Sequence, residues 1–207
     1  MRKITVIGIT GSIGMGKTTA AGMLREMDIP VHDSDASVHA LLGAQGKAVS
    51  LVGAAFPDAL KTDKNGDPYI DRPVLGRIVF GDRKKKRRLE EILHPMVRAE
   101  SDAFIADMIK KAHNIVALDI PLLFETGSER RVNVTICVTA PQDMQRNRVL
   151  ARPGMTSEKF ERIVAGQLPD AEKRQRADYV VETDKGFEEM RRQLEKIISQ
   201  IRRLQNA

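Results

Sequence analysis

Short apolar runs rich in β-branched residues alternate with longer amphipathic stretches along this chain. Five of the runs predict strands: Ile4–Ile9, Ile29–Asp33, Ile115–Asp119, Val132–Val138 and Tyr179–Glu182. Several of them are apolar without alternating polar positions, which is typical of strands that are covered on both faces. The stretch after Lys17 predicts a helix. Strand–helix alternation of this kind predicts an α/β fold with a parallel sheet and right-handed crossovers.

The last segment of the chain predicts an amphipathic helix. Its apolar residues recur at spacings of three or four, which places them on one face of a helix. They are Phe187, Met190, Leu194, Ile197, Ile201 and Leu204.

Residues 35–113 break the alternation, because they contain no run typical of a core strand. They include a turn-rich piece, Thr62–Pro68, which is followed by helical patterns as far as Lys111. Pro95 has no backbone N–H and disfavours helical geometry in the residue before it. We therefore expect one helix to end near His94 and another to start there.

Residues 144–176 break the alternation a second time. Their pattern is charged and helical, with an interruption at Pro153-Gly154. We expect both stretches to be insertions, on opposite flanks of a site, in one α/β core. The core then comprises residues 1–34, 114–143 and 177–207.

The octapeptide Gly11-Ser12-Ile13-Gly14-Met15-Gly16-Lys17-Thr18 fits the phosphate-loop pattern G-x-x-x-x-G-K-[ST]. A predicted strand precedes it and a predicted helix follows it, as the pattern requires. Glycines allow the backbone N–H groups to point at phosphate oxygens above the helix N-terminus. Lys17 is expected to reach the β- and γ-phosphates, and the Thr18 hydroxyl to ligate Mg²⁺. The sequence therefore predicts a nucleoside triphosphate site that uses Mg²⁺.

The layout around this loop favours a kinase. A GTPase would carry an Asn-Lys-x-Asp guanine motif, which this sequence lacks. A small core with two helical insertions suits a kinase that acts on a small molecule, because the insertions hold the acceptor and close over the phosphates. We thus expect a phosphate-loop nucleotide hydrolase and kinase fold, with a five-stranded parallel sheet, a substrate-binding insertion and a lid.

Asp33 ends the second predicted strand, and parallel sheets bind ligands at the carboxyl ends of their strands. Its carboxylate could orient an acceptor hydroxyl and take its proton late, which suits a loose phosphoryl-transfer transition state. The alternative is a helix start, for which Ser34 and Asp35 are good N-cap residues. We favour Asp33 as the functional carboxylate and Asp35 as a cap or a ligand of Mg²⁺-bound water.

Asp119 ends another apolar strand. It is a candidate for binding Mg²⁺ through water, in the manner of a Walker B acid. A turn role at the strand end explains it equally well.

Arg148 and Arg152 are four residues apart in the second insertion, so they share one helix face. Two guanidinium groups presented together suit the positioning and charge stabilisation of a transferring phosphate. Arg146 and Arg162 are weaker candidates. The alternative for this set is a solvated basic face.

Composition limits the class of protein. The chain has 207 residues and a formal net charge of +6, so one core is well supported, and polyphosphates, nucleic acid and acidic surfaces all fit the charge. Its single cysteine, Cys137, lies in an apolar run, which favours a reducing cytoplasm. No apolar run approaches the length of a membrane span or a signal peptide, so we expect a cytoplasmic protein.

Two local patterns imitate binding sites. Asp63, Asn65 and Asp67 resemble half of a calcium loop, but the following glycine and glutamate positions do not fit, so we expect a β-turn or hairpin tip. The basic run Arg83–Arg88 resembles a nucleic-acid signal. A solvated helix start explains that run better, with steering of polyanionic substrates as a secondary effect.

A series of motifs through nearly the whole chain resembles the dephospho-coenzyme A kinase family. Each motif is weak alone, but their order and spacing together are specific. They are Ile7–Gly11, Asp33-Ser34-Asp35, Ile70-Asp71-Arg72, Leu75, Val79-Phe80, Leu93-His94-Pro95, Pro121–Glu125, Gln145, Arg148, Arg152, Thr156, Gln167 and Ala177–Val181. Thr183 departs from the family, which usually has Asn after the last strand and uses this region on the adenine side of ATP.

The resemblance implies transfer of the ATP γ-phosphate to the ribose 3′-hydroxyl of dephospho-coenzyme A, with Mg²⁺. Asp33 matches the family's catalytic carboxylate, and Arg148 and Arg152 match its lid arginines. Residues 35–113 match the domain that holds the acceptor. His94 would lie near that acceptor, although a structural role beside Pro95 fits nearly as well. Asp119 is not reliably acidic in the family.

Two other functions remain as alternatives. A nucleotide or nucleoside kinase of similar layout would phosphorylate nucleoside monophosphates. A basic nucleic-acid-binding protein that uses ATP as a switch would bind oligonucleotides with a steep salt dependence. The second leaves Asp33 and the paired arginines unexplained, and we expect neither a nucleic-acid nor a membrane partner.

Overall fold

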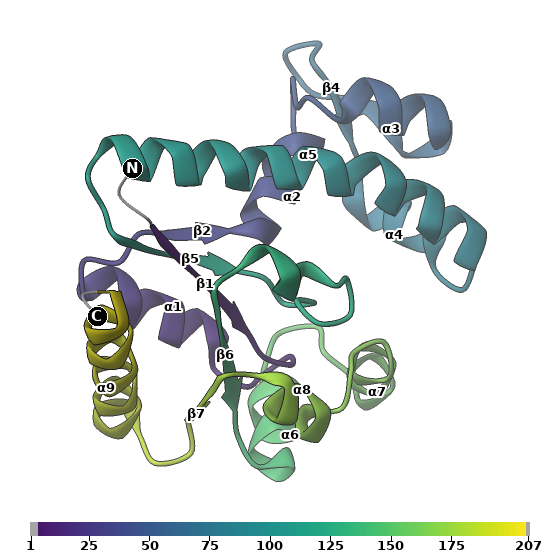
Figure 1. Cartoon of the computed structure of the whole chain (residues 1–207). Coiled ribbons are helices and arrows are strands. Elements are labelled where there is room, and N and C mark those ends of the chain that lie inside the picture. The colour runs from purple at the N-terminus through teal and green to yellow at the C-terminus, as the bar shows by residue number, and fades with distance from the viewer. Residues whose placement is uncertain (1–3, 206–207) are drawn as a thin grey trace. The chain divides into compact units, whose positions relative to one another are not determined.

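The computed structural model describes residues 4–205 of the protein, which belong to two compact units (Figure 1). The first unit comprises Met1–His32 and Asp107–Ala207, and the second comprises Asp33–Ala106. Residues 144–176, the predicted lid, fall within the first unit.

The first unit is built on a five-stranded parallel sheet in the order β2-β5-β1-β6-β7. All five predicted strands are confirmed, and their ends move by no more than two residues. The strands are β1 (Thr5–Thr10), β2 (Val31–Asp33), β5 (Ile115–Asp119), β6 (Val134–Thr139) and β7 (Tyr179–Glu182). β1 pairs in parallel with β5 on one side and with β6 on the other. The chain therefore changes direction across the sheet at β1, and the loop after β1 lies at a topological switch point.

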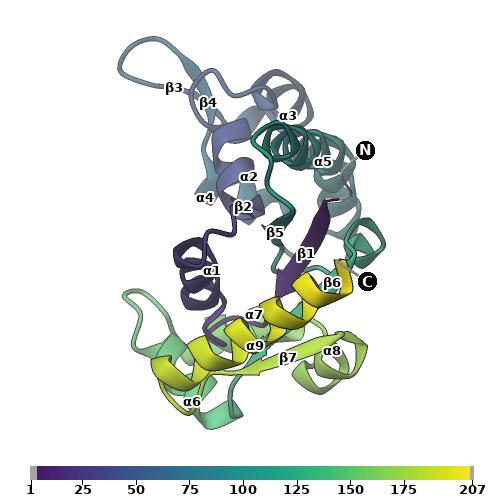
Figure 2. The ribbon, with the colours of Figure 1, turned by 60° about the vertical axis from the view of Figure 1, so that its left-hand side comes forward.

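Helices α1 (Lys17–Glu26) and α9 (Phe187–Gln205) lie together on one face of this sheet, as Figure 2 shows. Alternate strand residues such as Ile7, Ile9 and Ile136 point into the core beneath them. The predicted apolar face of α9 is confirmed in its middle turns, which are buried, whereas Phe187 and Leu204 at its ends are exposed.

The segment after β6 is helical, as predicted. It comprises α6 (Gln142–Leu150), α7 (Ser157–Ala165) and α8 (Asp170–Arg176), and the predicted break at Pro153-Gly154 separates α6 from α7. The 3₁₀ helix η2 (Ser128–Arg131) precedes β6. α8 packs against β6.

The second unit is mainly helical and has its own apolar core, which includes Val52, Phe56 and Leu75. Its elements are α2 (Ser34–Leu42), α3 (Val49–Ala55), η1 (Pro57–Ala59), β3 (Leu60–Thr62), β4 (Pro68–Ile70), α4 (Arg72–Val79) and most of α5 (Arg83–Lys110). β3 and β4 form an antiparallel hairpin, which confirms the predicted turn. Asp63 at its tip accepts hydrogen bonds from the backbone N–H groups of Asn65 and Asp67.

The predicted break in the helix at Pro95 is wrong, because α5 continues through it from Arg83 to Lys110. Pro95 removes one backbone hydrogen bond, but the residues around it belong to the core of the second unit. Leu93 is buried there, and Ile92 and Met96 pack against the same core. Burial of side chains on both sides of the proline offsets the local cost of about 3 kcal/mol.

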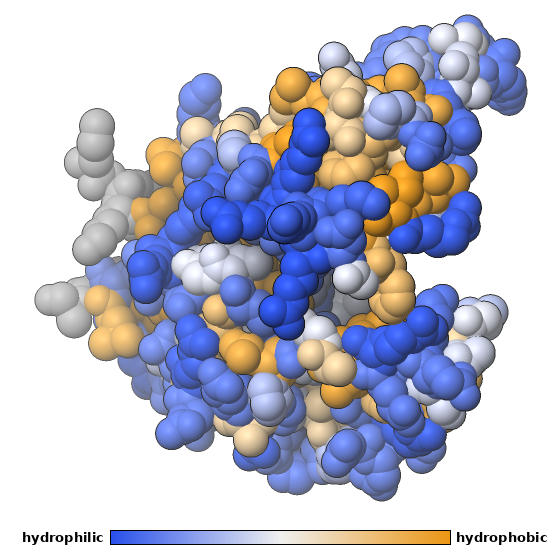
Figure 3. Space-filling model, turned by 90° about the vertical axis from the view of Figure 1, so that its right-hand side faces the viewer, coloured by the Kyte–Doolittle hydropathy of each residue, from blue (hydrophilic) through white to orange (hydrophobic). Residues whose placement is uncertain are grey.

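Hydrophilic residues dominate the face drawn in Figure 3, with smaller areas of apolar side chains between them. Among the helices of residues 4–205, none combines the length and the hydropathy needed to cross a bilayer. The basic run Arg83–Arg88 forms the exposed start of α5, as predicted.

Candidate active site

The phosphate loop, residues 11–18, connects β1 to α1 at the carboxyl edge of the sheet. β5 ends at this edge with Asp119, and β7 ends there immediately before Thr183. Parallel strands bring their carboxyl ends to one edge, so residues far apart in the sequence surround the loop. An ion pair from Asp119 and a hydrogen bond from Thr183 reach the loop.

Two glycines of the loop are required by its geometry. Gly14 has a φ of 79°, and a Cβ there would lie 2.5 Å from Val149 Cγ2 on α6. Gly16, with a φ of 94°, is the N-cap residue of α1. Positive φ angles of this kind are unfavourable for residues with a Cβ, and α6 packs so closely on the loop that Gly14 has no room for one.

Two glutamine side chains fix the position of Ile13 in the loop. Gln145 Nε2 on α6 donates to the Ile13 carbonyl at 2.8 Å, and Ile13 N–H donates to Gln167 Oε1 at 3.1 Å. Gln145 is 4% exposed, so its hydrogen bond forms away from solvent, where an unmade bond is costly. The two ends of the lid segment are therefore tied to the phosphate loop.

Lys17 forms an ion pair with Asp119 Oδ1. The side chains are 16% and 5% exposed respectively, so the pair is largely removed from water. Asp119 thus has a role that neither sequence-based alternative included, as the partner of the loop lysine. The pairing also places a carboxylate beside the position that a triphosphate would occupy.

A magnesium ion fits this site only as a partner of the nucleotide. No group of three or more His, Cys, Asp or Glu side chains within residues 4–205 is arranged to hold a metal. Mg²⁺ commonly takes one or two protein oxygens and completes its shell with phosphate oxygens and water. The exposed Thr18 hydroxyl and the Asp119 carboxylate supply protein oxygens of that kind next to the loop.

Asp33 is the N-cap of α2 in the second unit. Its Oδ1 accepts a hydrogen bond from Ala36 N–H at 3.0 Å. The expectation that Asp35 caps this helix is wrong, because Asp35 lies in its first turn and is exposed. Asp33 ends β2 with extended backbone angles, which suit a cap residue, whereas Asp35 is already helical. The cap uses Oδ1 and fixes the direction of the carboxylate.

The two lid arginines have different surroundings. Arg148 on α6 donates from Nη1 to Thr183 Oγ1 and from Nη2 to the Thr183 carbonyl, each at 2.8 Å. Arg152 lies just after α6 and is exposed. The alternative of a solvated basic face therefore fails for Arg148.

The weaker candidates, Arg146 and Arg162, make structural contacts within the lid segment, and His94 lies on α5. Arg146 donates to Ser157 Oγ at 3.1 Å and stacks over the ring of Phe160, 5.7 Å from its centroid. Arg162 donates from Nε to the Glu158 carbonyl within α7. His94 is half-buried in α5 beside Pro95.

Sequence reasoning missed a buried ion pair next to the site. Lys173 Nζ on α8 lies 2.8 Å from Glu125 Oε1, and the lysine side chain is fully buried. Glu125 Oε1 also accepts from Leu168 N–H at 2.9 Å, which ties the end of the lid segment to the loop after β5. Lys173 stands within the charged run of α8, so no sequence signal distinguished it from its exposed neighbours.

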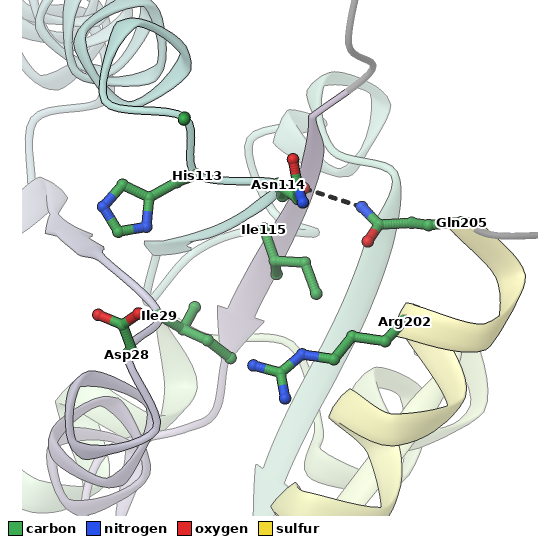
Figure 4. A pocket seen from close by; sticks show the side chains of 8 residues that line it. Asp28, Ile29, His113, Asn114, Ile115, Arg202 and Gln205 are labelled. Carbon is green, nitrogen blue, oxygen red and sulfur yellow. Dashed lines mark hydrogen bonds between the residues drawn. The ribbon is translucent and has the colours of Figure 1, made fainter.

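A pocket of about 340 Å³ lies at the opposite edge of the sheet, where β1 and β5 begin (Figure 4). Ile29 and Ile115 lie in its wall with Arg202, and Gln205 Nε2 donates to the Asn114 carbonyl at 2.8 Å. Because ligands of parallel sheets bind at the carboxyl ends of the strands, we assign this pocket no part in phosphoryl transfer.

Comparisons with known proteins agree on one family. A family model described as dephospho-CoA kinase matches residues 5–189. A dephospho-CoA kinase of Mesorhizobium japonicum is 50% identical over 197 residues, covering 95% of this chain and 96% of the relative. A Brucella melitensis protein of the same description is 49% identical over 194 residues, covering 94% of each.

Solved structures share the fold. The crystal structure of the Thermus thermophilus protein TT1252 has a TM-score of 0.81 and 34% identity, covering 95% of this chain and 96% of that one. A dephospho-CoA kinase from Campylobacter jejuni has a TM-score of 0.63 at 24% identity, covering 95% and 97% respectively. The second likeness shows the fold alone.

Proposed function

The chain belongs to the dephospho-CoA kinase family, and from this premise we propose how its residues carry out the reaction. The enzyme transfers the γ-phosphoryl group of ATP to the ribose 3′-hydroxyl of dephospho-coenzyme A and yields coenzyme A and ADP. The match over residues 5–189 supports this acceptor, and the phosphate loop with its paired Lys17 and Asp119 supports the donor.

Lys17 changes partner when ATP binds. Its ammonium group, which pairs with Asp119, moves to the β- and γ-phosphates, whose charge is larger. Backbone N–H groups of the loop other than those of Ile13 and Met15, which donate within the protein, bind the phosphates together with the N-terminus of α1. The glutamines on Ile13 and the close packing of α6 at Gly14 hold the loop in shape beforehand, so little ordering is needed on binding.

When bound with ATP, Mg²⁺ would offset the charge of the phosphates. Thr18 would hold it directly, and Asp119 or Asp35 through water. Asp119 is released for this task as Lys17 turns to the phosphates.

Asp33 accepts the proton of the acceptor hydroxyl. The 3′-oxygen forms a bond to the γ-phosphorus, and the bond from that phosphorus to the β,γ-bridging oxygen breaks, so that ADP leaves. A loose transition state needs little deprotonation of the nucleophile, and a carboxylate that orients the hydroxyl is sufficient. The cap at Ala36 N–H supports this role because it fixes the carboxylate without protonating it.

Arg148 and Arg152 bind the nucleotide phosphates and stabilise the charge of the transferring group. Residues 35–113 hold the coenzyme A portion of the acceptor, and His94 contributes to that binding. Residues 144–176 act as the lid. We place the enzyme in the cytoplasm, with ATP and dephospho-coenzyme A as its partners and neither nucleic acid nor membrane among them.

The test is ADP release from ATP and Mg²⁺ with dephospho-coenzyme A, beside a panel of nucleoside monophosphates. Release confined to dephospho-coenzyme A supports the assignment. Release only with nucleoside monophosphates would make the protein a nucleotide kinase and would remove the proposed role of residues 35–113. Lys17→Ala is the control, because it should lose activity with every acceptor.

A further inference from the structure

Thr183 connects a lid arginine to the phosphate loop. Its hydroxyl donates to the Met15 carbonyl at 3.0 Å and accepts from Arg148 Nη1 at 2.8 Å. Arg148 Nη2 donates to the Thr183 carbonyl, also at 2.8 Å. A carbonyl can only accept and a guanidinium can only donate, so both partners fix the direction of the hydroxyl proton.

Thr183 is itself held firmly. It is 6% exposed, and its N–H donates to the Thr139 carbonyl at 2.9 Å, which continues the sheet by one residue beyond β7. Its side chain also packs against the loop, because a Cβ placed at Gly16 would lie 3.1 Å from Thr183 Cγ2. Burial leaves little water to replace these hydrogen bonds if the hydroxyl is removed.

The two hydrogen bonds to Arg148 form a fork. A guanidinium bound at both terminal nitrogens has a fixed plane as well as a fixed position, which a single contact would not give. Met15 lies two residues before Lys17, so the same threonine also restrains the loop close to the lysine. Arg152, by contrast, is exposed and has no such restraint in the described part of the chain.

We propose that Thr183 is a positioning residue, which fixes the Arg148 guanidinium relative to the phosphate loop so that both act on the same nucleotide. The proposal rests on the role of Arg148 in ATP binding and turnover given above. A hydroxyl performs this task because it donates to the loop and accepts from the arginine at the same time.

Thr183→Val keeps the shape of the side chain and removes both hydroxyl hydrogen bonds. A lost hydrogen bond to a charged group corresponds to about tenfold or more in kcat/KM for ATP. We expect a loss of that size for Thr183→Val, whereas Thr183→Ser should restore the wild-type value within about twofold, because it keeps the hydroxyl. Thr183→Val at the wild-type value, or Thr183→Ser as impaired as Thr183→Val, would overturn the proposal.

A double-mutant cycle separates positioning from general support of the fold. Arg148→Lys keeps the charge but cannot form the fork, so it should resemble Thr183→Val. Adding Thr183→Val to Arg148→Lys should then cause a smaller loss in kcat/KM for ATP than Thr183→Val causes in the wild type, because only the hydrogen bond to the Met15 carbonyl remains to be lost. Fully additive losses would mean that Thr183 acts without Arg148, and would also overturn the proposal. Thr183→Ser keeps the test decisive if Thr183→Val folds poorly, because a folded Thr183→Ser variant with impaired kcat/KM for ATP would still overturn the proposal.

Thr135→Val is the matched control. Thr135, in β6, is also 6% exposed, and its hydroxyl also makes two hydrogen bonds, in this case with Asp178, which directly precedes β7. Loss of the Thr135 hydroxyl should lower the melting temperature and leave kcat/KM for ATP unchanged.

Calorimetric titration with ATP and Mg²⁺ measures the effect of the Thr183 variants on ATP binding without any acceptor. Suppose that the variants bind ATP with the expected order of affinities while the protein fails to phosphorylate dephospho-coenzyme A. In that case the assigned acceptor is wrong and the inference about Thr183 still holds.

Discussion

Lys17 of the phosphate loop forms an ion pair with Asp119 at the end of β5, and only 5% of the aspartate side chain is exposed. Each residue is thus the other's charge partner before a nucleotide arrives. In the proposed mechanism, ATP binding exchanges this partner for the phosphates, which would link the state of the carboxylate to the presence of substrate.

Lys17→Ala should lower kcat/KM for ATP by about two orders of magnitude with any acceptor, because the lysine stabilises charge on the transferring phosphate. It should also destabilise the fold by about 3 kcal/mol, since Asp119 becomes a buried charge without its partner. Steady-state kinetics and urea unfolding measure the two effects. The double variant Lys17→Met/Asp119→Asn removes both charges, so it should regain stability and remain inactive. Unchanged kinetics for Lys17→Ala would contradict the assignment of the loop.

Asp33→Asn should retain ATP binding and lose turnover by about two orders of magnitude, because an amide cannot accept the acceptor proton. Asparagine is also a good N-cap residue, so α2 should remain capped. Asp82→Asn is the matched control, since Asp82 caps α5 through the N–H groups of Lys84 and Lys85. Near-normal turnover of Asp33→Asn would remove Asp33 from the mechanism.

Gly14→Ala should lower activity, whereas Gly22→Ala should raise stability, although both glycines lie near the start of the chain. A Cβ at Gly14 would meet Val149 Cγ2 at 2.5 Å and would need a φ of 79°, so kcat/KM for ATP should fall sharply. A Cβ at Gly22, inside α1, would meet nothing within 4 Å. Gly22→Ala should therefore stabilise the protein by about 0.5–1 kcal/mol, and thermal melting measures this. An active Gly14→Ala variant would contradict the close contact of α6 with the loop.

Cys137 should not react with thiol reagents in the folded protein. Burial, with a smaller contribution from the nearby Asp170 carboxylate, raises the pKa of its thiol to about 12. The thiolate is the reactive form, so almost none is present at pH 8. Labelling with a disulfide reagent should proceed only on unfolding in guanidinium. The chain has one cysteine, so the signal has a single source. Rapid labelling under native conditions would show that the core around β6 opens readily.

The strands and the phosphate loop could be predicted from the sequence because both are local patterns. A strand covered on both faces is a short apolar run, and the loop motif needs glycine, lysine and threonine at fixed spacing. The continuity of α5 through Pro95 could not be predicted from the sequence, because the packing of Ile92, Leu93 and Met96 outweighs the local effect of proline. The cap of α2 was also misplaced, since Asp33, Ser34 and Asp35 have similar propensities and differ only in backbone angles.

The sequence by itself determined the family, the loop that binds phosphate and the residues that could carry charge to it. Only the tertiary structure decided how those residues pair. Lys17 and Asp119 are separated by 102 positions, and Arg148 and Thr183 by 35. Neither pair has a spacing that a local pattern could reveal. They meet because parallel strands end at one edge of the sheet, and that edge is formed only when the whole core is packed.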